Sequence, residues 1–467
     1  MPFTRFDKAY FIGIGGIGMS ALARWFASRG VQVGGYDRTP TALTAELQAE
    51  GISVHYDDNP ALIDESFLAD PERTLVCYTP AIPADSAELA FFRGRGQQVV
   101  KRSAVLGMVA QGLPSIAVAG THGKTTTSAL VAHLLHTGQM PCLAFVGGIT
   151  RNYASNLILP DAEQDEVQPI AVLEADEYDR SFLQLHPDVA VFTSLDPDHL
   201  DIYGTPAEML ATYRQFAGQL KPGGYRVVHH SIVEQLLPEG ASADSVLTYG
   251  IGVGQARAEG VRAEGDTFVF DLITEDFALH GVRLRMPGYH NVENAVAAAA
   301  ACARVGLPAA AIRQGLETFL GVQRRFEFHP IAGTRVLVDD YAHHPREIEA
   351  FLRSMRGLYP GRDLTVAFQP HLFTRTRDFA EGFGQALSLA DRVLLLDIYP
   401  ARELPLPGIT ADTIGRYISG PVVYRTTLQN LPNQLAALPG LDVVATVGAG
   451  DIYTTLPQIA NLLATTP

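Results

Sequence analysis

The sequence is poor in cysteine and lysine, and it lacks long hydrophobic runs. Its three cysteines lie far apart and none forms a C-x-x-C pair, so neither a disulfide framework nor a cysteine-based zinc cluster is expected. No apolar run is long enough to span a bilayer, and glycines and Asp7 interrupt the N-terminal stretch that superficially resembles a signal peptide. We therefore expect a cytoplasmic protein without membrane insertion. The only lysines are Lys8, Lys101, Lys124 and Lys221.

Basic residues are also outnumbered by acidic ones. The 50 acidic residues exceed the 35 lysines and arginines and give a formal net charge of −15, which argues against nucleic-acid binding through bulk charge. Hydrophobic residues make up 47% and charged residues 18% of the chain, a balance typical of a globular protein with buried cores. At about 150 residues per domain, the length predicts about three domains. The sequence does not identify a protein partner.

Short apolar runs alternate with helical stretches, which predicts parallel sheets covered by helices. In the first block, the expected strands are residues 9–14, 31–36, 74–78 and 98–100, and the expected helix is 19–28. In the second block, they are strands 115–119, 170–173 and 189–194, a helical run at 127–136, antiparallel strands within 226–286 and a buried helix at 292–305. In the third block, they are strands 336–338, 364–368, 393–396 and 443–447. We expect an α/β fold of three doubly wound domains, 1–113, 114–322 and 323–467.

A glycine-rich turn follows the first expected strand. Gly13-Ile-Gly15-Gly16-Ile-Gly18 opens an expected helix, and Asp37 closes the next strand. Glycines allow the tight turn and let backbone N–H groups approach a diphosphate at the helix N-terminus, and the later acid would meet a ribose. The motif predicts a nucleotide diphosphate site in a Rossmann-like domain and does not distinguish NAD from another diphosphate. The alternative is a merely tight strand-to-helix turn.

A second glycine-rich turn, residues 120–126, reads G-T-H-G-K-T-T and again lies between an apolar strand and a helical run. Position 118 is valine, so the motif is shorter than the common P-loop pattern. The physics is unchanged, because backbone donors and the helix dipole hold phosphates, Lys124 neutralises them, and the Thr125 hydroxyl is a ligand for Mg²⁺. The motif predicts ATP binding, and a structural glycine turn is the alternative.

Acidic residues follow the next two strands of this block. In Glu174-Ala-Asp176-Glu177-Tyr178-Asp179, Glu174 comes first after the strand, where a P-loop domain places a Mg²⁺ ligand. Any of these acids can instead be a solvated loop charge, the favoured interpretation for Asp179. In Asp196-Pro-Asp198-His199-Leu-Asp201, the histidine is either a ligand of a second metal ion or a structural hydrogen-bonding group.

The third block places polar residues at the ends of its strands. Three of its histidines would suit a transition metal: His343, His344 and His371. Binding of an anionic group by Arg375 or Arg377 is favoured over such a metal site, because a guanidinium matches carboxylate and phosphate geometry. Arg324-Arg325 upstream is another candidate for anion binding, and its alternative is a solvated basic pair at a hinge.

These motifs together resemble the Mur ligases of peptidoglycan synthesis. The matching stretches cover nearly the whole chain: GIGGIGMSALA, AVAGTHGKTTT, EADEYDRSFL, DHLDIYG, GYHNVENA, RRFE, VDDYAHHP, FQPHLFTRTRD and VGAGDIYT. The resemblance is strongest to the members that join L-alanine to UDP-N-acetylmuramate. It implies that ATP phosphorylates the lactyl carboxylate, and that the amine of L-alanine then attacks the acyl phosphate. It also implies a part in cell wall biogenesis, cell shape and cell division.

The resemblance implies roles for individual residues. The ATP site would comprise Gly120, Thr121, His122, Gly123, Lys124, Thr125, Thr126, Asn291, Asn294 and Asp340. The UDP-sugar site would comprise Gly15, Gly16, Gly18 and Asp37. Two Mg²⁺ ions would be bound by Thr125, Glu174 and His199. The amino-acid site would comprise Tyr341, His343, His371 and Arg375. The residues expected to act in catalysis are Lys124, Glu174, His199 and Arg325.

Two features of the chain depart from the family pattern. Some sister ligases carry a carbamylated lysine near the metal ions, but no lysine lies between His199 and Lys221. Relatives that add alanine often read H-R-F-T-R where this chain has Leu372 after His371, so one arm of the expected carboxylate clamp is missing. Arg375 or Arg377 would then bind the carboxylate alone.

Three other functions remain as alternatives. Within the family, a recycling ligase would attach a preformed tripeptide to the same sugar nucleotide. An NAD-dependent oxidoreductase would account for the first glycine turn but would leave the P-loop and Glu174 without a role. A nucleotide-binding protein without catalysis would release no phosphate when all substrates are present.

Overall fold

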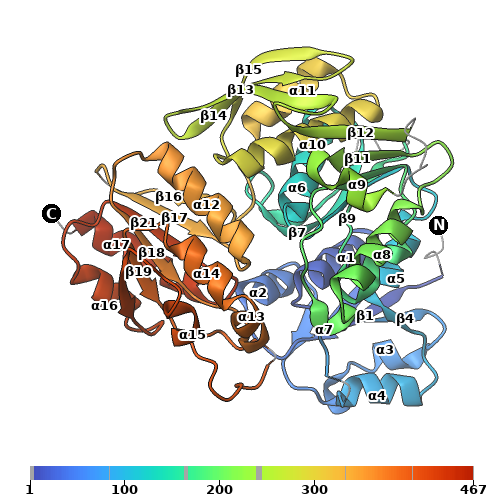
Figure 1. The fold of residues 1–467 in the computed structure, drawn as a ribbon. Coiled ribbons are helices and arrows are strands. Elements are labelled where there is room, and N and C mark those ends of the chain that lie inside the picture. Colours follow the sequence, from blue (N-terminus) through green and yellow to red (C-terminus); the bar gives the residue numbers. More distant parts are fainter. Residues whose placement is uncertain are drawn as a thin grey trace. The chain divides into compact units, whose positions relative to one another are not determined.

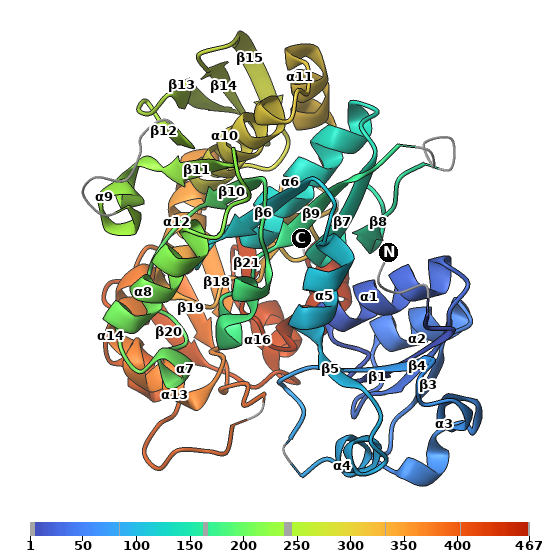
Figure 2. The same cartoon turned by 90° about the vertical axis from the view of Figure 1, so that its right-hand side faces the viewer.

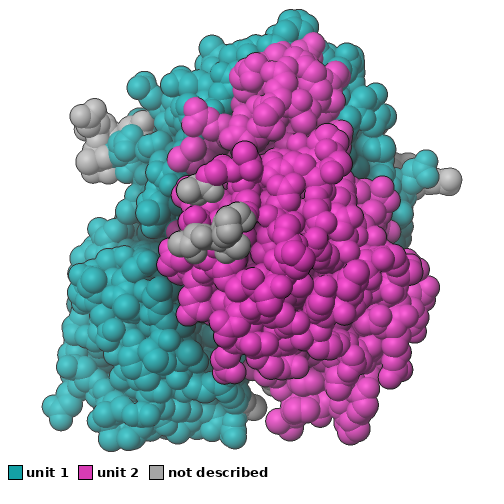
Figure 3. Space-filling view, turned by 90° about the vertical axis from the view of Figure 1, so that its left-hand side faces the viewer, with its two compact units in different colours: residues 1–259, 272–280, 293–318 teal, residues 260–271, 281–292, 319–467 magenta. Residues whose placement is uncertain are grey.

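The computed structural model describes residues 5–83, 85–161, 167–237, 245–331, 333–401 and 403–465. These residues form three sheets with helices packed on them (Figures 1 and 2). The backbone divides into two compact units, coloured teal and magenta in Figure 3. Unit 1 comprises residues 1–259, 272–280 and 293–318, and unit 2 comprises residues 260–271, 281–292 and 319–467.

The first sheet lies in unit 1 and has parallel strands in the order β3-β2-β1-β4-β5. Its strands are β1 (Lys8–Ile12), β2 (Gln32–Tyr36), β3 (Ser53–His55), β4 (Thr74–Tyr78) and β5 (Val99–Lys101). Its helices are α1 (Ile17–Ser28), α2 (Ala42–Ala49), α3 (Ser66–Ala69), α4 (Ala87–Gly94) and α5 (Arg102–Ala110). The predicted strands and helix are confirmed, with ends that differ by at most two residues.

The first strand is buried on both faces of this sheet. Ala9 and Phe11 belong to the apolar cluster that includes side chains of α1 and α5. Tyr10 and Ile12 belong to a second cluster, which includes Phe67 of α3. A strand covered on both faces has a continuous apolar sequence, and this is why its sequence predicted it.

The second sheet has the strand order β15-β14-β13-β12-β11-β10-β6-β9-β7-β8. Its strands are β6 (Ser115–Ala119), β7 (Cys142–Thr150), β8 (Ser155–Ile158), β9 (Ile170–Glu174), β10 (Val189–Phe192), β11 (Tyr225–His229), β12 (Val246–Ile251), β13 (Ala256–Glu264), β14 (Thr267–Ile273) and β15 (Ala278–Leu284). Its helices are α6 (Lys124–Thr137), α7 (Leu200–Tyr203), α8 (Pro206–Ala217), α9 (Val233–Leu236), α10 (Tyr289–Arg304) and α11 (Ala309–Thr318). Strands β13 to β15 are divided between the two units.

The prediction of antiparallel strands within 226–286 is wrong for the first strands of that segment. β11 pairs in parallel with β10 and β12, and β12 pairs in parallel with β13. An alternating apolar pattern shows that one face of a strand is buried, but it carries no information about the direction of its neighbour. The antiparallel hairpin of β7 and β8, at the other edge, was not predicted.

Helices α1 and α5 lie between the first and second sheets of unit 1 (Figure 2). One apolar cluster includes Phe26 of α1, Val105 of α5, Leu157 of β8 and Phe192 of β10. The two sheets therefore share a continuous core, and the glycine turn that opens α1 is attached to both of them.

The third sheet lies in unit 2 and has the order β16-β17-β21-β18-β19-β20. Its strands are β16 (Glu327–His329), β17 (Val336–Asp340), β18 (Leu364–Phe368), β19 (Arg392–Leu395), β20 (Val422–Arg425) and β21 (Val443–Val447). All are parallel except β16, which pairs antiparallel with β17. Its helices are α12 (Pro345–Leu358), α13 (Phe373–Asp378), α14 (Ala380–Leu387), α15 (Asp412–Gly415), α16 (Leu431–Ala436) and α17 (Leu456–Thr465).

No helix among the described residues is both long enough and apolar enough to cross a membrane. The α/β fold with three mostly parallel sheets agrees with the fold class predicted from the sequence. In such sheets, ligands bind outside the carboxyl ends of the strands. The glycine turns after β1 and β6 and the acidic segment after β9 all lie at such ends.

Candidate active site

The turn between β6 and α6 depends on two glycines with positive φ. Gly123 precedes α6 with φ of 79°, and a Cβ on it would lie 2.6 Å from Oδ1 of Asn294. Gly120 has φ of 135°, and a Cβ there would lie 2.0 Å from Oγ1 of Thr193. Both close approaches explain why this turn requires glycine.

The side chains at the start of α6 converge with the end of β9. The Thr125 hydroxyl donates to Oε1 of Glu174 over 3.0 Å, and the Gly147 N–H of β7 donates to Oε2 over 2.8 Å. Burial raises the pKa of Glu174, against the effect of the Lys124 ammonium. The structure thus brings together the three side chains that the sequence predicted around the phosphates: Lys124, Thr125 and Glu174.

Glu177 is a further buried acid of this site, and its role was not predicted. Its side chain is 2% exposed, and its Oε1 accepts a hydrogen bond from Nζ of Lys124 over 3.0 Å. Lys124 also donates to the carbonyls of Gly120 and Thr121. Burial alone lowers the pKa of Lys124, but the carboxylates of Glu177, Asp176 and Glu174 outweigh burial and raise it. The lysine is therefore held as a cation inside the turn.

His199 lies beside the same acid. Its Nε2 is 4.0 Å from Oε1 of Glu177, and its ring meets that of Tyr178 edge-on at 5.2 Å between centroids. The residue has φ of 53° and precedes α7, and its N–H donates to Oδ1 of Asp198. The acids beside the His199 ring are thus Glu177 and Asp198, whose Oδ2 lies 3.8 Å from Nε2, and its role as a metal ligand stays a prediction.

The segment after β10 is hydrogen-bonded to the P-loop turn. The Ser194 hydroxyl accepts from the His122 N–H over 2.9 Å, and the Thr121 hydroxyl donates to the Asp196 carbonyl over 2.7 Å. The His122 ring pairs with the Asp196 carboxylate at 3.3 Å. Thr121 and His122 thus position the turn through contacts with this segment, a role that the sequence had not predicted for Ser194 and Asp196.

The first glycine turn has a different set of neighbours. Gly15 donates its N–H to Oδ2 of Asp37 over 2.8 Å, so the acid predicted near this turn lies against its backbone. Gly16 is the N-cap of α1 and no side chain caps the helix. A Cβ on Gly18 would lie 2.7 Å from Nη1 of Arg102. The last glycine of the motif therefore leaves room for a guanidinium, which the sequence had not singled out.

Arg102 also joins this turn to the acidic segment after β9. Its Nη2 donates to Oδ2 of Asp176 over 3.3 Å, and the neighbouring Lys101 pairs with Asp179. The side chain of Asp179 is 39% exposed and paired with Lys101, so it is a surface charge with an ion-pair partner. Lys101 ends β5 and Arg102 begins α5, whereas Asp179 lies in η3 (Tyr178–Gln184) and Asp176 just before it.

The two asparagines expected at the adenine lie three positions apart on α10. Oδ1 of Asn294 accepts from the Thr127 hydroxyl over 3.2 Å, which places Asn294 against the P-loop helix in unit 1. Asn291, which belongs to unit 2, donates to the Pro287 carbonyl over 2.8 Å. Residues three apart share one face of a helix, as a common adenine site requires.

Arg324 is a structural arginine of unit 2. Its guanidinium donates to Asp339 over 3.2 Å and to the carbonyls of Gly448 and Gly450. Asp339 is fully buried and also accepts from Thr446 over 2.6 Å. The solvated-pair interpretation of Arg324-Arg325 is therefore wrong for Arg324, which cross-links the strand ends of β17 and β21.

Asp340 is the last residue of β17, and Arg325 lies close to it. The carboxylate of Asp340 accepts the N–H groups of Phe326 and Ala342, each over 2.8 Å. Burial raises the pKa of Asp340 to about 7, although the Arg325 guanidinium opposes this shift. Arg325 stacks over the ring of Tyr341 at 4.9 Å. The structure thus groups three predicted site residues around β17.

The histidines of unit 2 do not form a metal site. His343 and His371 face each other with 6.1 Å between ring centroids, and His371 stacks on Tyr399. His344 instead caps α12 and packs against Phe379. Nowhere in the described ranges do three or more histidine, cysteine, aspartate or glutamate side chains form a group suited to a metal ion.

The arginines near α13 differ in burial. Arg375 is buried, at 7% exposed, whereas Arg377 is ion-paired with Asp378 at the surface. Leu372 precedes α13 with φ of 68°, an uncommon conformation for a non-glycine residue, and it is buried. Arg375 is therefore the better placed of the two for binding an anion within the domain.

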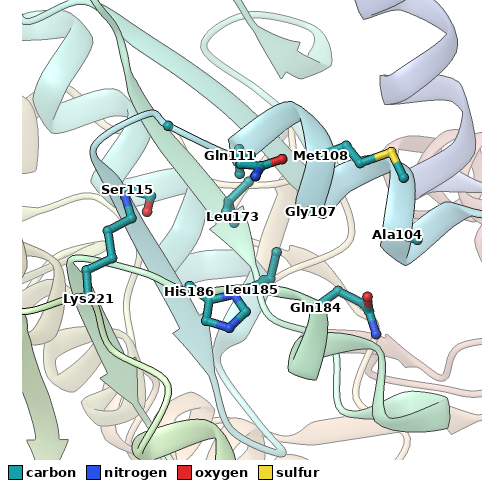
Figure 4. Close-up of a pocket in the computed structure, with 12 residues that line it drawn as sticks. Ala104, Gly107, Met108, Gln111, Ser115, Leu173, Gln184, Leu185, His186 and Lys221 are labelled. Carbon is teal, nitrogen blue, oxygen red and sulfur yellow. The ribbon is translucent and has the colours of Figure 1, made fainter. Parts of the chain in front are cut away.

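A cavity of about 440 Å³ lies elsewhere in unit 1, between α5 and the start of β6 (Figure 4). Lys221 and Ser115 lie at one end of it, and Met108 and Ala104 at the other. The residues that line it include none of those predicted for the nucleotide sites. Lys221 there is bonded to Asp188 and to the Leu113 carbonyl.

The comparisons with known proteins agree with this arrangement. Three family models match: the Mur ligase family catalytic domain over residues 8–113, the Mur ligase middle domain over 118–302, and the Mur ligase glutamate ligase domain over 324–450. They cover most of the chain. The chain belongs to the Mur ligase family.

Several known proteins are similar to this chain over nearly its whole length. UDP-N-acetylmuramate–L-alanine ligase of Cytophaga hutchinsonii is 46% identical over 97% of this chain and 96% of the relative. The protein of that name from Phocaeicola vulgatus is 44% identical over 99% of both chains. The crystal structure of UDP-N-acetylmuramate-alanine ligase from Thermotoga maritima has a TM-score of 0.81 at 27% identity, and covers 97% of this chain and 98% of that chain. This Mur ligase is therefore an ATP-dependent ligase with the predicted three-domain fold.

Some of the predicted site residues lie together in the structure, and other residues of these clusters were not predicted. The P-loop cluster and the cluster around β17 each contain predicted Mur ligase site residues. Glu177, Arg102 and the Thr193–Asp196 segment were missed, because nothing in their spacing shows that they are buried against the glycine turns. The domain boundaries and the assignment of each residue to a substrate stay predictions.

Proposed function

We propose that this Mur ligase joins L-alanine to the lactyl carboxylate of UDP-N-acetylmuramate, using ATP. An oxygen of the carboxylate attacks the γ-phosphorus of ATP, giving an acyl phosphate and ADP. The amine of L-alanine then attacks the acyl carbon, a C–N bond forms, the C–O bond to phosphate breaks, and the amine loses a proton. The observation that carries the proposal is the Lys124–Thr125–Glu174 cluster in a chain 46% identical to a ligase of that name.

The residues of the P-loop cluster would bind ATP. No side chain caps the start of α6 at Gly123, so the N–H groups of its first turn and its positive N-terminal end would face the phosphates. Lys124 is already a cation in this turn, since its pKa is raised by the neighbouring carboxylates. It would neutralise the triphosphate and stabilise the charge that develops during transfer. Asn294 and Asn291 on α10 would contact the adenine, and Asp340 the ribose.

The donors present fit a Mg²⁺ ion. Thr125 and Glu174 offer two oxygens 3.0 Å apart, and Mg²⁺ in such sites is bound by one or two carboxylates together with substrate phosphates. When bound, the ion would reduce the repulsion between the attacking carboxylate and the triphosphate. His199 would serve a second ion, as the sequence suggested, and Glu177 lies next to it. Thr125 and Glu174 would supply oxygen ligands, and His199 would supply a nitrogen ligand.

The turn before α1 would bind the diphosphate of the sugar nucleotide. Gly16 leaves the helix without a capping side chain, and no acid lies in its first turn. Arg102 adds a guanidinium beside Gly18, which suits a diphosphate. Asp37 would lie near the uridine ribose.

The remaining predicted residues would bind the amino acid. Tyr341, His343 and His371 form a group of rings in unit 2, and Arg375 is buried in the same unit. Arg375 would bind the alanine carboxylate in the absence of an arginine at Leu372, and Arg325 would contact phosphate. We propose the cytoplasm as the location, and residues 1–113, 114–322 and 323–467 as the domains for UDP-sugar, ATP and amino acid.

The test compares two acceptors under identical conditions. Purified protein is supplied with ATP, Mg²⁺ and UDP-N-acetylmuramate, and inorganic phosphate is measured with L-alanine, with a preformed tripeptide, or with neither. We expect release with L-alanine only. Exclusive use of the tripeptide would replace the proposal by the recycling reaction, and no release with either acceptor would favour a non-catalytic nucleotide-binding role. Binding of NAD(H) without affinity for UDP-sugars would support the oxidoreductase alternative.

A further inference from the structure

A single buried side chain attaches α1 to the second sheet of unit 1. Asn156 of β8 is fully buried, and every side-chain hydrogen bond found for it goes to α1. Its Nδ2 donates to the Ile17 carbonyl over 2.6 Å and to the Ser20 hydroxyl over 2.8 Å. Its Oδ1 accepts from Nη1 of Arg24 over 2.6 Å. A buried amide satisfied in this way fixes both of its partners, since leaving them unpaired is costly.

The bonds of Asn156 reach the start of α1, which is the part next to the glycine turn. Ile17 directly follows Gly16, the N-cap residue of the helix. Arg24, one to two turns further along, continues the network to α2 through Glu50 at 2.7 Å and Glu46 at 3.1 Å. A residue of the second sheet is therefore hydrogen-bonded to the helix turn that directly follows the glycine turn.

The hairpin that carries Asn156 also reaches the phosphate cluster. The Thr150 hydroxyl of β7 donates to the Ser155 carbonyl over 2.8 Å and closes the hairpin next to Asn156. Further back on β7, the Gly147 N–H donates to Glu174, which in turn accepts from Thr125. The β7–β8 hairpin thus contacts the start of α1 through Asn156 and the predicted Mg²⁺ ligand through Gly147.

We propose that Asn156 is a positioning residue that aligns the two nucleotide sites of unit 1. This inference rests on the proposed function, because it assigns the lactyl carboxylate to a substrate held at α1 and the γ-phosphate to the P-loop. The two reacting groups are bound by different sheets, so their separation depends on how firmly these sheets are joined. A displacement of about 1 Å is enough to lower the rate of such a reaction by about a hundredfold.

The first test separates alignment from binding. For Asn156→Ala we expect kcat for phosphate release to fall about tenfold or more, while the dissociation constants for UDP and for ADP, each measured alone by calorimetry, change less than about twofold. Asn152→Ala is the matched control, since Asn152 lies in the turn of the same hairpin but donates to Thr318 of α11. An unchanged kcat in a folded Asn156 variant overturns the proposal. So does a loss of UDP or ADP affinity that accounts for the whole effect.

A second measurement does not depend on activity. Spin labels at Ala90→Cys of α4 and Glu234→Cys of α9, both exposed positions of unit 1, report the distance between the two sheets, and the native cysteines are buried. We expect a single narrow distance distribution that broadens in Asn156→Ala and not in Asn152→Ala. A distribution that stays narrow overturns the proposal. This readout holds even if the chain does not use L-alanine, so the two failures are distinguishable.

A milder variant covers the case in which Asn156→Ala does not fold. Ser20→Ala removes one acceptor of the Asn156 amide and leaves its bonds to Ile17 and Arg24 in place. We expect a smaller fall in kcat, with unchanged affinities for UDP and ADP. If Ser20→Ala lowers thermal stability without lowering kcat, Asn156 has a purely structural role and the proposal is wrong.

Discussion

At the scale of single residues, the account depends most on Lys124. Its ammonium is buried in the P-loop and bonded to Glu177 and to two backbone carbonyls. For Lys124→Ala we expect ligation to be abolished while UDP-sugar binding is largely retained, because the diphosphate turn lies before α1 and not before α6. Phosphate release and calorimetry with the sugar nucleotide measure the two effects.

The matched control for this variant is Lys221→Ala. Lys221 is bonded to Asp188 and the Leu113 carbonyl, at the opposite end of β6 from the P-loop. We expect it to retain turnover at a lower thermal stability. Equal loss of ligation and of UDP-sugar binding in Lys124→Ala would contradict the assignment of the two turns to different nucleotides.

Arg102 allows a second prediction at this scale. Arg102→Ala is expected to weaken UDP binding by about tenfold to a hundredfold, because charge-assisted hydrogen bonds contribute about 1.5–3 kcal/mol. Lys101→Ala removes the neighbouring cation, which pairs with Asp179 instead of lying against Gly18, and is expected to change UDP affinity far less. Calorimetry with UDP alone measures both. Equal effects of the two variants would indicate a general loss of positive charge instead of a specific contact.

At the scale of the element, the P-loop turn depends on a glycine that cannot be replaced. Gly123→Ala places a methyl group 2.6 Å from Asn294 at a φ of 79°. Gly223 has φ of 80° and no atom within 4 Å of an added Cβ, so Gly223→Ala carries the same backbone strain without the contact. The strain costs about 1–2 kcal/mol in both variants.

The two glycine variants therefore differ only in the contact. We expect Gly123→Ala to lose more stability than Gly223→Ala and to lose ADP affinity, measured by thermal unfolding and calorimetry. Similar stability and ADP affinity in both variants would show that the close approach to Asn294 is not needed for the site.

A buried acid on a helix beside the first sheet gives a prediction about the pH dependence of stability. Glu88 of α4 is fully buried and accepts from the Tyr10 hydroxyl over 2.8 Å, and burial raises its pKa from 4.5 to about 7. The native state therefore keeps this proton at pH values where the unfolded chain has lost it. The free energy of unfolding falls as pH rises from 4.5 to about 7 through this group.

Glu88→Gln keeps the acceptor for Tyr10 and removes the titration. In the unchanged protein, this group makes the free energy of unfolding smaller at about pH 7 than at about pH 5. We expect this decrease to be smaller in the Glu88→Gln variant. His55, whose pKa is lowered by burial, acts in the opposite direction, and its Nε2 lies 3.2 Å from Oε1 of Glu88. Denaturant unfolding at several pH values measures the difference. Parallel curves for the two proteins would mean that Glu88 does not titrate in this range.

The sequence predicted the positions of the strands along the chain better than it predicted how the strands pair. The strands 74–78, 115–119, 364–368 and 443–447 agree with the structure to the residue, because all are parallel strands buried on both faces. The pairing direction of β11 and β12 and the hairpin of β7 and β8 were not predicted correctly. These depend on which segments meet in space, which periodicity alone does not encode.

The candidate site was predictable to the extent that its chemistry lies in short motifs. Lys124, Thr125 and Glu174 follow strands that end at one edge of a sheet, so their convergence could be expected. Glu177 and Arg102 could not be assigned in this way. The spacing within 174–179 does not show the contacts of Asp176 and Glu177, and only the fold buries Glu177 against Lys124 and pairs Asp176 with Arg102.

At the scale of the whole molecule, unit 1 holds both glycine turns in one continuous core. The cluster from Phe26 to Phe192 joins the two sheets through α1 and α5, and Asn156 adds a polar attachment at the same place. Unit 2 carries the group around Asp340 and Tyr341. In the proposed reaction, unit 1 thus carries both phosphate-binding turns, and unit 2 carries the predicted amino-acid site.

The central claim is that the carboxylate of UDP-N-acetylmuramate becomes an acyl phosphate before the amide forms. The most direct measurement uses sugar nucleotide in which both oxygens of the lactyl carboxylate are a heavy isotope, with ATP and L-alanine, and mass spectrometry of the phosphate released. The account predicts one labelled oxygen in each phosphate, because the bond between the acyl carbon and that oxygen breaks when the amine attacks. Phosphate without the label, formed alongside the amide, would contradict it.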